Sequence, residues 1–342
     1  MTVFFRVDVG ANAGMGHLMR CLALAQELQD NGDTVGFICP ELSYVRSLLD
    51  DEGISIHAIT AGLCISDDVA NTCCLAKSAG ADIVVLDGYE FNELYQRAMR
   101  DHGPDLGLVS VDDTAQTHYA TDIVVNQNLG AETLKYSRDP GTRLLLGPSY
   151  LMLRRVFLEA RPRQVHDHAR RVVVSMGGSD PANATAIACR ALAALDRDDL
   201  AVRVIVGAAN PHLETLEAEI ASYVEGSEIV VAPDNVADHF GWADVAVSSG
   251  GSTSWELAYL GVPNVILTQA DNQDQIAGVL DRQGLAVWCG RSGDIDISRF
   301  SVCLSELIEN LGRRKRLSRD GQQIVDGYGV KRVAAELRKL AA

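Results

Sequence analysis

A short glycine-containing segment that ends in a histidine is the first place in the chain where chemistry could occur. Val9–His17 reads Val-Gly-Ala-Asn-Ala-Gly-Met-Gly-His and lies between a β-branched run and an apolar helical stretch. Gly14 and Gly16 would let a ligand approach the backbone closely, and His17, at the start of the helix, could act as a general base. The alternative is a histidine that only begins the helix, and its position alone does not choose between the two.

The same segment lacks two common nucleotide-binding patterns. No Gly-Lys-Ser/Thr follows the glycines, as a P-loop requires, and the Gly-x-Gly-x-x-Gly spacing of dinucleotide-binding folds is absent. Nucleotide hydrolysis by a P-loop and a nicotinamide cofactor are therefore disfavoured. Asp8 and Arg20, on either side of the segment, could orient groups at a site or could simply pair with other charges.

A second glycine segment, Ser248–Glu256, again follows an apolar strand pattern. Backbone N–H groups and hydroxyls would form a diphosphate cradle at its small residues, which are Gly250, Gly251, Ser252 and Thr253. Glu256, one turn further on, could accept hydrogen bonds from ribose hydroxyls. The alternative is a capping box, with Ser252 or Thr253 as the helix cap and Glu256 bonding back to it.

Two more polar turns follow apolar strands in the second half of the chain. Ser175–Asn183 contains a glycine turn at Gly178, and Asn183 could cap the next helix or contact a ligand. Thr268–Gln273 ends in Asn272 and Gln273, whose amides suit sugar hydroxyls or acetamido groups. As an alternative, Asp271 or Asn272 caps the helix that runs to Arg282.

In the first half, acidic residues end two apolar strand patterns. Asp87 and Tyr89 follow one strand, and Asp112 and Asp113 follow the next. Carboxylates at that place could bind sugar hydroxyls or serve as an acid, whereas a solvated strand end is the alternative for any one of them.

These segments need a scaffold that brings strand ends together, and the chain has the pattern for one. Short β-branched runs alternate with helical patterns, which is typical of βαβ units in a parallel sheet, so we expect an α/β fold. The expected strands of the first half are Val3–Val9, Thr34–Cys39, Ser55–Ile59, Ile83–Leu86, Gly107–Val111, Ile123–Asn126 and Arg143–Leu146. Those of the second half are Arg171–Ser175, Val202–Val206, Glu228–Val231, Val245–Ser248, Asn264–Leu267 and Leu285–Trp288, before closing helices in Arg299–Leu340.

The pattern restarts near Arg171, and a polar stretch with Pro162 precedes it. We therefore predict two doubly wound, Rossmann-like domains, residues 1–160 and 165–342, with the glycine loops of both around one cleft, where ligands of such folds bind.

The composition disfavours several classes of binding partner. The chain of 342 residues has 46 Asp+Glu against 30 Lys+Arg, a net charge of −16, which disfavours nucleic acid and anionic membrane surfaces. No apolar run approaches the ~18 residues of a membrane span. The eight cysteines form no Cys-x-x-Cys pair, which favours reduced core thiols, no metal site and a cytoplasmic protein. We expect a small-molecule ligand.

Taken together, the motifs resemble the UDP-sugar hydrolases of the pseudaminic acid pathway. The first is Gly14-x-Gly16-His17-x-x-Arg20-Cys21, and several others agree in order, namely Arg6-x-Asp8, Asp87-x-Tyr89, Val111-Asp112-Asp113, Leu146-Gly147-Pro148-x-Tyr150, Met176-Gly177-Gly178-Ser179-Asp180-Pro181, Gly251-Ser252-Thr253-x-Trp255-Glu256 and Asp271-Asn272-Gln273. The resemblance covers roughly residues 3 to 290. Many members of that family have a histidine where this chain has Gly88, a difference that concerns the sugar pocket.

The resemblance implies a GT-B fold and a cofactor-free, metal-independent, inverting hydrolysis of UDP-2,4-diacetamido-2,4,6-trideoxy-β-L-altrose. It implies that the second domain holds UDP, with Gly250–Thr253 at the diphosphate, Glu256 at the ribose and Asn183 and Asn272 as further contacts, while His17 activates water. The free sugar would serve the synthesis of a nonulosonic acid for flagella or surface polysaccharide.

Two alternatives remain open at the level of sequence. A GT-B glycosyltransferase would share the UDP site but deliver the sugar to an acceptor, and a non-catalytic UDP-sugar-binding protein would show no turnover.

Overall fold

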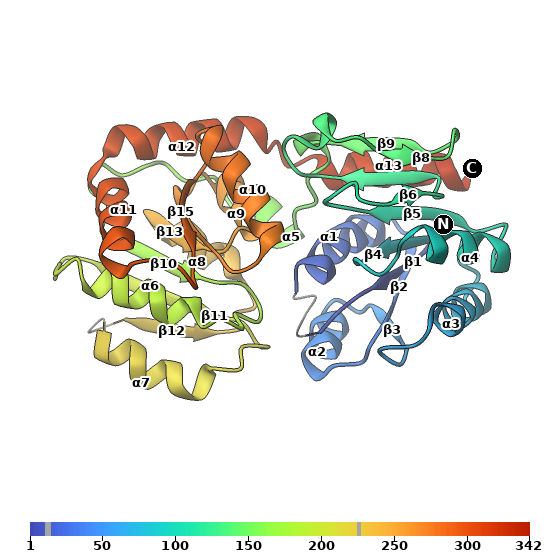
Figure 1. The fold of residues 1–342 in the computed structure, drawn as a ribbon, viewed down its shortest axis with the longest axis horizontal. Helices are drawn as coiled ribbons and strands as arrows, with labels where there is room; N and C mark the ends of the chain where they lie inside the picture. Colours follow the sequence, from blue (N-terminus) through green and yellow to red (C-terminus); the bar gives the residue numbers. More distant parts are fainter. Residues whose placement is uncertain (11–14, 224–226) are drawn as a thin grey trace. The chain divides into compact units, whose positions relative to one another are not determined.

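The computed structural model describes residues 1–10, 15–223 and 227–342. Of residues 219, 221–223 and 272 it describes the backbone only. Contacts divide the chain into two compact units (Figure 1). Unit 1 comprises Met1–Arg155 and Gly327–Ala342, and unit 2 comprises Val156–Asp326. Each unit is built on a parallel sheet with helices on both faces, as the alternating pattern predicts.

The sheet of unit 1 has the strand order β3-β2-β1-β4-β5-β7-β9. Its strands are β1 (Thr2–Val7), β2 (Thr34–Cys39), β3 (Ser55–Ala58), β4 (Ile83–Asp87), β5 (Gly107–Val111), β7 (Ile123–Asn126) and β9 (Arg143–Leu146). The order reverses between β1 and β4, so the carboxyl ends of these neighbours form a topological switch point, where ligands of open α/β sheets bind.

Helices cover both faces of this sheet. They are α1 (Gly16–Asp30), α2 (Ser43–Asp51), α3 (Ile65–Ser78) and α4 (Glu93–His102). Residues of α3 and α4, among them Val69 and Met99, pack with Val84, Leu86 and Leu108 into one buried cluster. A small two-stranded sheet of β6 (His118–Tyr119) and β8 (Ser137–Arg138) and the 3-10 turns η1 (Ala131–Thr133) and η2 (Pro148–Tyr150) complete the first stretch of unit 1.

The sheet of unit 2 has the order β12-β11-β10-β13-β14-β15, which places its own switch point between β10 and β13. The strands are β10 (Arg171–Ser175), β11 (Ala201–Val206), β12 (Glu228–Val231), β13 (Val245–Ser248), β14 (Asn264–Thr268) and β15 (Val287–Arg291). The helices are α5 (Arg155–Leu158), α6 (Ala184–Ala193), α7 (Leu213–Tyr223), α8 (Val236–Trp242), α9 (Thr253–Leu260), α10 (Asp271–Arg282), α11 (Ile297–Glu309) and α12 (Leu311–Ile324).

Successive residues of β10 belong to opposite faces of that sheet. Val172 and Val174 lie in the cluster formed with α6, α7 and α11, whereas Val173 packs with Phe157, Phe240 and other residues on the second face. This arrangement follows from the two-residue period of a strand, and it explains why the run Val172–Val174 is uniformly apolar.

Several strand boundaries differ from the expected ones, most of them by one residue, and β1 and β15 differ most. β1 ends at Val7 rather than Val9, because Gly10 takes a φ of +146° and turns the chain away from the sheet. β15 begins at Val287 rather than Leu285, since the Leu285 N–H closes the end of α10 by donating to the Leu280 carbonyl at 2.9 Å.

The closing helix α13 (Gly329–Ala341) corrects the expected domain limits, because it belongs to unit 1 and not to the second domain of residues 165–342. Its buried face includes Val330, Val333 and Leu337. Arg338 pairs with Asp33 at 2.7 Å, and α13 packs beside α1. The spacing of apolar residues shows that a helix has a buried face but not which unit covers it.

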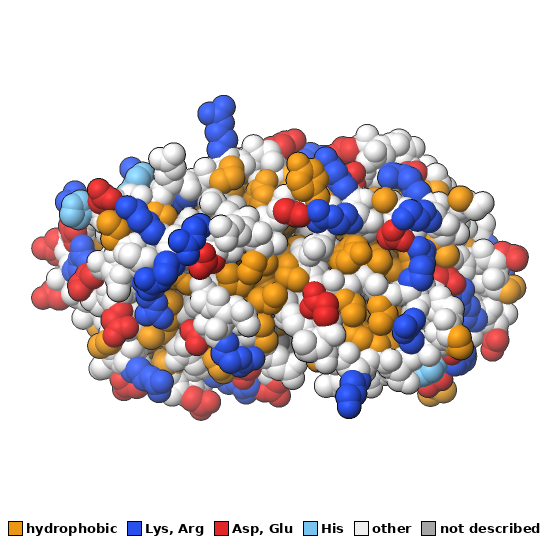
Figure 2. Space-filling view, turned by 90° about the horizontal axis from the view of Figure 1, so that it is seen from above, with side chains coloured by type: hydrophobic (Ala, Val, Ile, Leu, Met, Phe, Trp, Pro, Cys, Tyr) orange, Lys and Arg blue, Asp and Glu red, His pale blue; other side chains and the backbone are white. Residues whose placement is uncertain are grey.

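Charges of both signs are mixed on one face of the molecule (Figure 2). On the face drawn in Figure 2, Lys and Arg side chains are interspersed with Asp and Glu, and no continuous basic area of the kind that tracks a nucleic-acid backbone is visible there. None of the helices in the described ranges combines the length and the apolar character that crossing a bilayer requires.

The close packing of α13 against Leu151 depends on Gly329, so a substitution of this glycine tests it. A Cβ on Gly329 would lie 2.5 Å from Leu151 N and 2.6 Å from Leu151 C, so Gly329→Ala should lower the free energy of unfolding by roughly 1–3 kcal/mol through overpacking. Urea unfolding measures this. Gly141→Ala is the matched control, because a Cβ there meets nothing within 4 Å. Equal stability of the two variants would contradict the close approach.

Candidate functional site

The switch point of unit 1 brings His17 to Asp87. His17 is the second residue of α1, which begins after β1, and Asp87 is the last residue of the adjacent β4. The His17 Nδ1 lies 2.6 Å from Asp87 Oδ1. Both side chains are buried, with 5% of His17 and none of Asp87 exposed. The spacing of the two residues in the sequence, 70 positions, gives no indication of this contact.

Arg20, one turn further along α1, joins the same pair. Its Nε and Nη2 donate to the two oxygens of Asp87 at 2.6 and 2.7 Å, and its Nη1 donates to both oxygens of Asp113 at 2.7 and 2.9 Å. Asn128 also donates to Asp113 at 2.7 Å. The guanidinium therefore bridges two carboxylates in a fork geometry that fixes all three side chains.

This network sets the protonation of Asp87. Burial by itself would raise the pKa of Asp87, but the Arg20 guanidinium and His17 lower it to about 2. Burial would likewise lower the pKa of Arg20, whereas Asp113 and Asp87 raise it well above its usual value. Asp87 is thus an ionised acceptor.

The ionised carboxylate in turn assigns the tautomer of His17. Arg20 Nη2 also approaches His17 Nδ1, at 3.0 Å, and a single nitrogen cannot both donate and accept in its plane. Since Asp87 can only accept and is the nearer partner, we infer that Nδ1 carries the proton. Nε2 then holds a lone pair, and no residue in the described ranges hydrogen-bonds to it.

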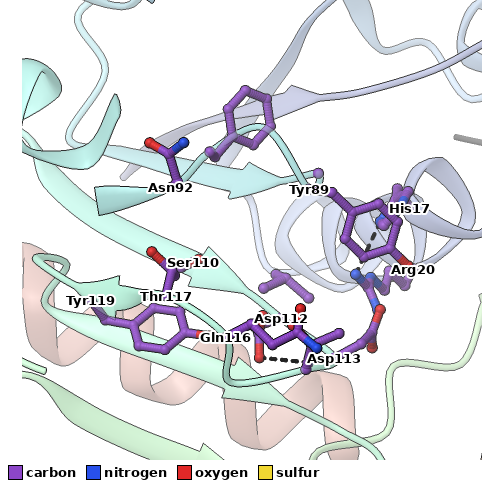
Figure 3. A pocket seen from close by; sticks show the side chains of 14 residues that line it. His17, Arg20, Tyr89, Asn92, Ser110, Asp112, Asp113, Gln116, Thr117 and Tyr119 are labelled. Atoms are coloured by element: carbon purple, nitrogen blue, oxygen red, sulfur yellow. Dashed lines mark hydrogen bonds and ion pairs between the residues drawn. The ribbon is translucent and has the colours of Figure 1, made fainter. Parts of the chain in front are cut away.

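His17 lines a cavity of about 290 Å³ that lies entirely within unit 1 (Figure 3). Tyr89 stands beside the imidazole, with the two rings perpendicular and their centroids 4.9 Å apart. The remaining walls come from α1, from the ends of β4 and β5 with the segments that follow them, and from β6. They include Arg20, Asn92, Ser110, Asp112, Asp113, Gln116, Thr117 and Tyr119. The structure thus brings together His17, Asp87 and Tyr89 as the sequence suggests.

Gly88 lies between these residues and lines the cavity. A Cβ on Gly88 would lie 2.8 Å from Asp8 Cγ and 2.9 Å from Asp8 Cβ. Burial raises the pKa of Asp8, against the opposing effect of Arg6. The Asp8 carboxyl therefore occupies the space that a side chain at position 88 would need. A histidine at this position, as in the hydrolase motif, would require Asp8 to move.

Gly14 and Gly16 are the other predicted ligand-binding residues of the first glycine segment. Gly16 begins α1, and a Cβ there would meet nothing within 4 Å. Gly14 lies outside the described residues, so its expected role stays a prediction.

In unit 2 the two glycine turns also meet at a switch point. The turn with Gly177 and Gly178 follows β10, and the turn with Gly250 and Gly251 follows the adjacent β13. A Cβ on Gly177 would lie 3.7 Å from Ser249 Oγ. Gly178 is in close contact with Gly207, where a Cβ would lie 2.5 Å from the Gly178 carbonyl carbon. Neighbouring loops of small residues form an open backbone surface of the kind that binds phosphates.

The third polar turn of unit 2 packs against the second. A Cβ on Gly250 would lie 2.8 Å from the Gln273 carbonyl oxygen, so only glycine fits there. Gln273 Oε1 accepts a hydrogen bond from Gln269 N at 2.7 Å, at the beginning of α10. Neither Asp271 nor Asn272 is the N-cap of this helix, a position that Ala270 takes without a side-chain bond. The side chain of Asn272 is outside the described part of the chain.

Asn183 does not cap its helix by its side chain. It takes the N-cap position of α6 with a φ of +50°, but Asp180 provides the cap by accepting from the N–H groups of Ala184 and Thr185 at 2.8 and 3.0 Å. Asn183 Oδ1 is buried without a partner among the described residues. The capping alternative is therefore wrong for Asn183, and a ligand contact stays a prediction.

The capping box expected as the alternative at α9 is also not formed at Ser252. Ser252 takes the N-cap position without a side-chain bond, and Thr253 is the first residue of the helix. Glu256 is 6% exposed. The Ser254 hydroxyl instead ties the turn together by donating to the Ser249 carbonyl at 3.2 Å. The Ser252 side chain thus makes no hydrogen bond to the start of α9, and the Glu256 side chain is buried.

Sequence reasoning missed the polar cavity lining formed by Asn92, Ser110, Gln116, Thr117 and Tyr119. Ser110 lies within an apolar strand, Asn92 caps α4, Tyr119 lies in the short strand β6, and Gln116 and Thr117 precede that strand, so no motif marks them. Within the described residues no group of three or more His, Cys, Asp or Glu side chains is arranged to hold a metal ion.

The fold is that of the GT-B proteins, two Rossmann-like domains in one chain. The structure of Acinetobacter baumannii MurG matches with a TM-score of 0.68 at 18% identity, covering 99% of each chain. The spinosyn rhamnosyltransferase SpnG matches with a TM-score of 0.69 at 16% identity over the whole of both chains. Staphylococcus aureus MnaA, solved with UDP, matches with a TM-score of 0.69 at 13% identity, covering 99% of this chain and 96% of that one.

Among curated proteins, the chain is similar to three at low identity. The Bacillus subtilis spore coat polysaccharide biosynthesis protein SpsG is 25% identical, covering 99% of this chain and 98% of its own length. The UDP-2,4-diacetamido-2,4,6-trideoxy-β-L-altropyranose hydrolase of Campylobacter jejuni is 22% identical over 84% of this chain and 98% of that protein. An uncharacterised Methanocaldococcus jannaschii protein, MJ1062, is 26% identical, and the chain spans only 57% of its length. No protein-family model matches the chain.

The Asp87 network predicts an acid-dependent loss of stability. The folded-state pKa of about 2 lies below the ordinary value of 3.8, so the ionised carboxylate stabilises the fold above that value and loses this effect as the pH falls from about 4 to 2. The full contribution is about 2 kcal/mol. Between pH 6 and pH 3, urea unfolding should show wild type losing about 1 kcal/mol more than Asp87→Asn.

The difference between the two losses of unfolding free energy removes the contribution of carboxylates whose titration Asp87→Asn does not change. Equal losses in wild type and Asp87→Asn would show that Asp87 has an ordinary pKa.

Proposed function

We propose that the protein hydrolyses a UDP-linked 2,4-diacetamido-2,4,6-trideoxy hexose of the β-L-altrose type, releasing UDP and the free sugar for nonulosonic acid synthesis. The observation that carries this proposal is the buried His17–Asp87 pair in the wall of a cavity of about 290 Å³, which provides a base that could activate water. Similarity to the Campylobacter jejuni hydrolase and to SpsG supports the substrate class.

His17 would act as the general base. A water molecule attacks the anomeric carbon on the face opposite UDP, its proton passes to His17 Nε2, and the anomeric C–O bond breaks with its electron pair leaving on the diphosphate. Asp87 holds the Nδ1 proton and stabilises the imidazolium that forms. Attack from the opposite face gives inversion. Tyr89 borders the imidazole, where it would limit how the water and the sugar can lie.

Unit 2 would supply the UDP-binding groups. The Gly250–Thr253 loop and the start of α9 offer backbone N–H groups to the diphosphate, where they would stabilise the charge that develops on the leaving group. Glu256 would accept from the ribose hydroxyls. Gly178 and Asn183, which precede α6, and Asn272 and Gln273, in the first turn of α10, are proposed as further contacts, and Asn183 has an unpartnered side-chain oxygen among the described residues.

Loss of the base should abolish turnover and spare UDP binding. His17→Ala should lower kcat roughly 10²- to 10⁴-fold, the usual contribution of a general base, while calorimetry shows an unchanged Kd for UDP. UDP release from the diacetamido sugar nucleotide, measured without acceptor and in the presence of EDTA, is the assay.

The matched control is His102→Ala, which removes an exposed histidine at the end of α4, away from the cavity. Normal turnover in His17→Ala would show that His17 is not the general base.

The diphosphate loop can be tested with a pair of glycines. A Cβ on Gly251 meets nothing within 4 Å, so Gly251→Ala should fold with unchanged stability. If the diphosphate lies against the backbone there, the added methyl should still raise the Kd for UDP about tenfold, since it prevents the close approach. Gly241→Ala, equally unhindered and in α8 of the same unit, is the control. An unchanged Kd for Gly251→Ala would remove this loop from the site.

A glycosyltransferase is the second candidate, favoured by the structural match to SpnG. It predicts UDP release only when an acceptor is present. A non-catalytic UDP-sugar-binding protein predicts binding of UDP by calorimetry and no release with or without acceptor. The acceptor-free assay with wild type therefore separates the hydrolase from the other two functions. Release of UDP on addition of an acceptor then separates the glycosyltransferase from the non-catalytic binding protein.

A further inference from the structure

The cavity of unit 1 continues beyond His17 into a recess that the proposed mechanism does not use. We call the distal recess the part lined by Asn92, Ser110, Asp112, Gln116, Thr117 and Tyr119. In Figure 3, Ser110, Thr117 and Tyr119 lie on the opposite side of the cavity from His17 and Tyr89. A sugar whose anomeric carbon lies at His17 would direct its remote ring substituents into this recess.

The Arg20 guanidinium, which lines the cavity, is already paired with two carboxylates. Arg20 directs all three of its nitrogens to Asp87 and Asp113, at 2.6 to 2.9 Å. Asp112 and Asp113 both line the cavity, and the lining contains no Lys and no second Arg. The fixed charges of the recess are therefore carboxylates, which repel a carboxylate and attract N–H or O–H donors.

Several polar groups of the recess still have hydrogen-bonding capacity. Ser110 is only 5% exposed, and among the described residues its hydroxyl has no partner. Asn92 uses its side-chain oxygen to accept from Tyr95 N at 3.3 Å, which leaves its amide N–H groups available. Ser110 is buried, so a ligand that satisfies its hydroxyl is favoured, whereas Asn92 is exposed and offers its donors without that cost.

Asp112 and Tyr119 offer acceptors in the same place. Asp112 Oδ2 accepts from Thr114 N at 2.9 Å and Ala115 N at 2.7 Å, whereas Oδ1 has only a long contact of 3.4 Å to the Thr114 hydroxyl. Tyr119 is 1% exposed, and burial together with the neighbouring Asp112 carboxylate raises the pKa of its hydroxyl, which lies next to Asp112. The recess thus combines a carboxylate acceptor with neutral donors.

We propose that the distal recess selects the sugar by charge, accepting a neutral hydrogen-bonding substituent such as an acylamino group at the remote end of the ring and excluding a carboxylate. Asp112 accepts from the amide N–H or hydroxyl of that substituent, and Ser110 and Asn92 donate to its carbonyl oxygen. This inference rests on the proposed function, which sets the anomeric carbon at His17.

The test measures binding to His17→Ala, so that it does not depend on turnover. Calorimetry compares UDP, the UDP-diacetamido sugar, and the matched pair UDP-N-acetylglucosamine and UDP-N-acetylglucosaminuronic acid, which differ only in a hydroxymethyl against a carboxylate. The diacetamido sugar nucleotide should bind more tightly than UDP. The neutral member of the pair should bind about tenfold more tightly than the anionic one, as one close like-charge contact implies.

Two variants assign the effect to the recess. Asp112→Asn removes the charge but keeps the acceptor for Thr114 and Ala115, and it should reduce the tenfold discrimination to about threefold or less. Ser110→Ala should weaken the diacetamido sugar nucleotide several-fold and leave the Kd for UDP unchanged. Asp105→Asn, an identical charge change at an exposed residue outside the cavity, is the control.

Three results would overturn the proposal: a diacetamido sugar nucleotide that binds no better than UDP, a uronate that binds as well as its neutral partner, or discrimination that Asp112→Asn leaves intact. Failure of the proposed function looks different, since wild type would then release no UDP while the discrimination between the sugars persisted.

Discussion

The Asp87 carboxylate, fully buried at the end of β4, is the charge on which the cavity of unit 1 depends. A buried carboxylate is unfavourable unless it is paired, and Arg20 supplies two hydrogen bonds while His17 supplies a third. These bonds orient the imidazole and fix its proton on Nδ1. The same guanidinium extends to Asp113, which lines the cavity. A single ionised group thus couples the end of β4, the first turn of α1 and the turn after β5.

The saturation of Arg20 has a consequence for recognition. A guanidinium in the wall of a cavity would ordinarily suggest a partner for an anionic ligand, but here each of its three nitrogens is already bonded to a carboxylate. The groups that keep hydrogen-bonding capacity are neutral or acidic, such as Ser110 and Asp112. The groups that are paired orient His17, and the groups with remaining hydrogen-bonding capacity line the distal recess.

Unit 2 uses backbone in place of charged side chains. The turns after β10 and β13 lie side by side at the switch point, and their glycines bring Gly250 against Gln273 and Gly178 against Gly207 so closely that a Cβ would not fit. Loops packed in this way expose N–H groups at a helix start, which bind phosphates without any net positive charge. A protein with a net charge of −16 can therefore bind a diphosphate.

The sequence by itself determined the class of fold, the two Rossmann-like domains and the glycine turns, because strand and helix periods and turn residues are local properties. It also drew attention to His17, Asp87 and Tyr89 through motifs. Tertiary structure alone decided the contact of His17 with Asp87 over 70 residues, the bridging role of Arg20, the return of α13 to unit 1, and the lining of the recess by Ser110 and Tyr119. The reason is that strand order, which sets the neighbours at a sheet edge, and the partner of an apolar face are not encoded in any local spacing.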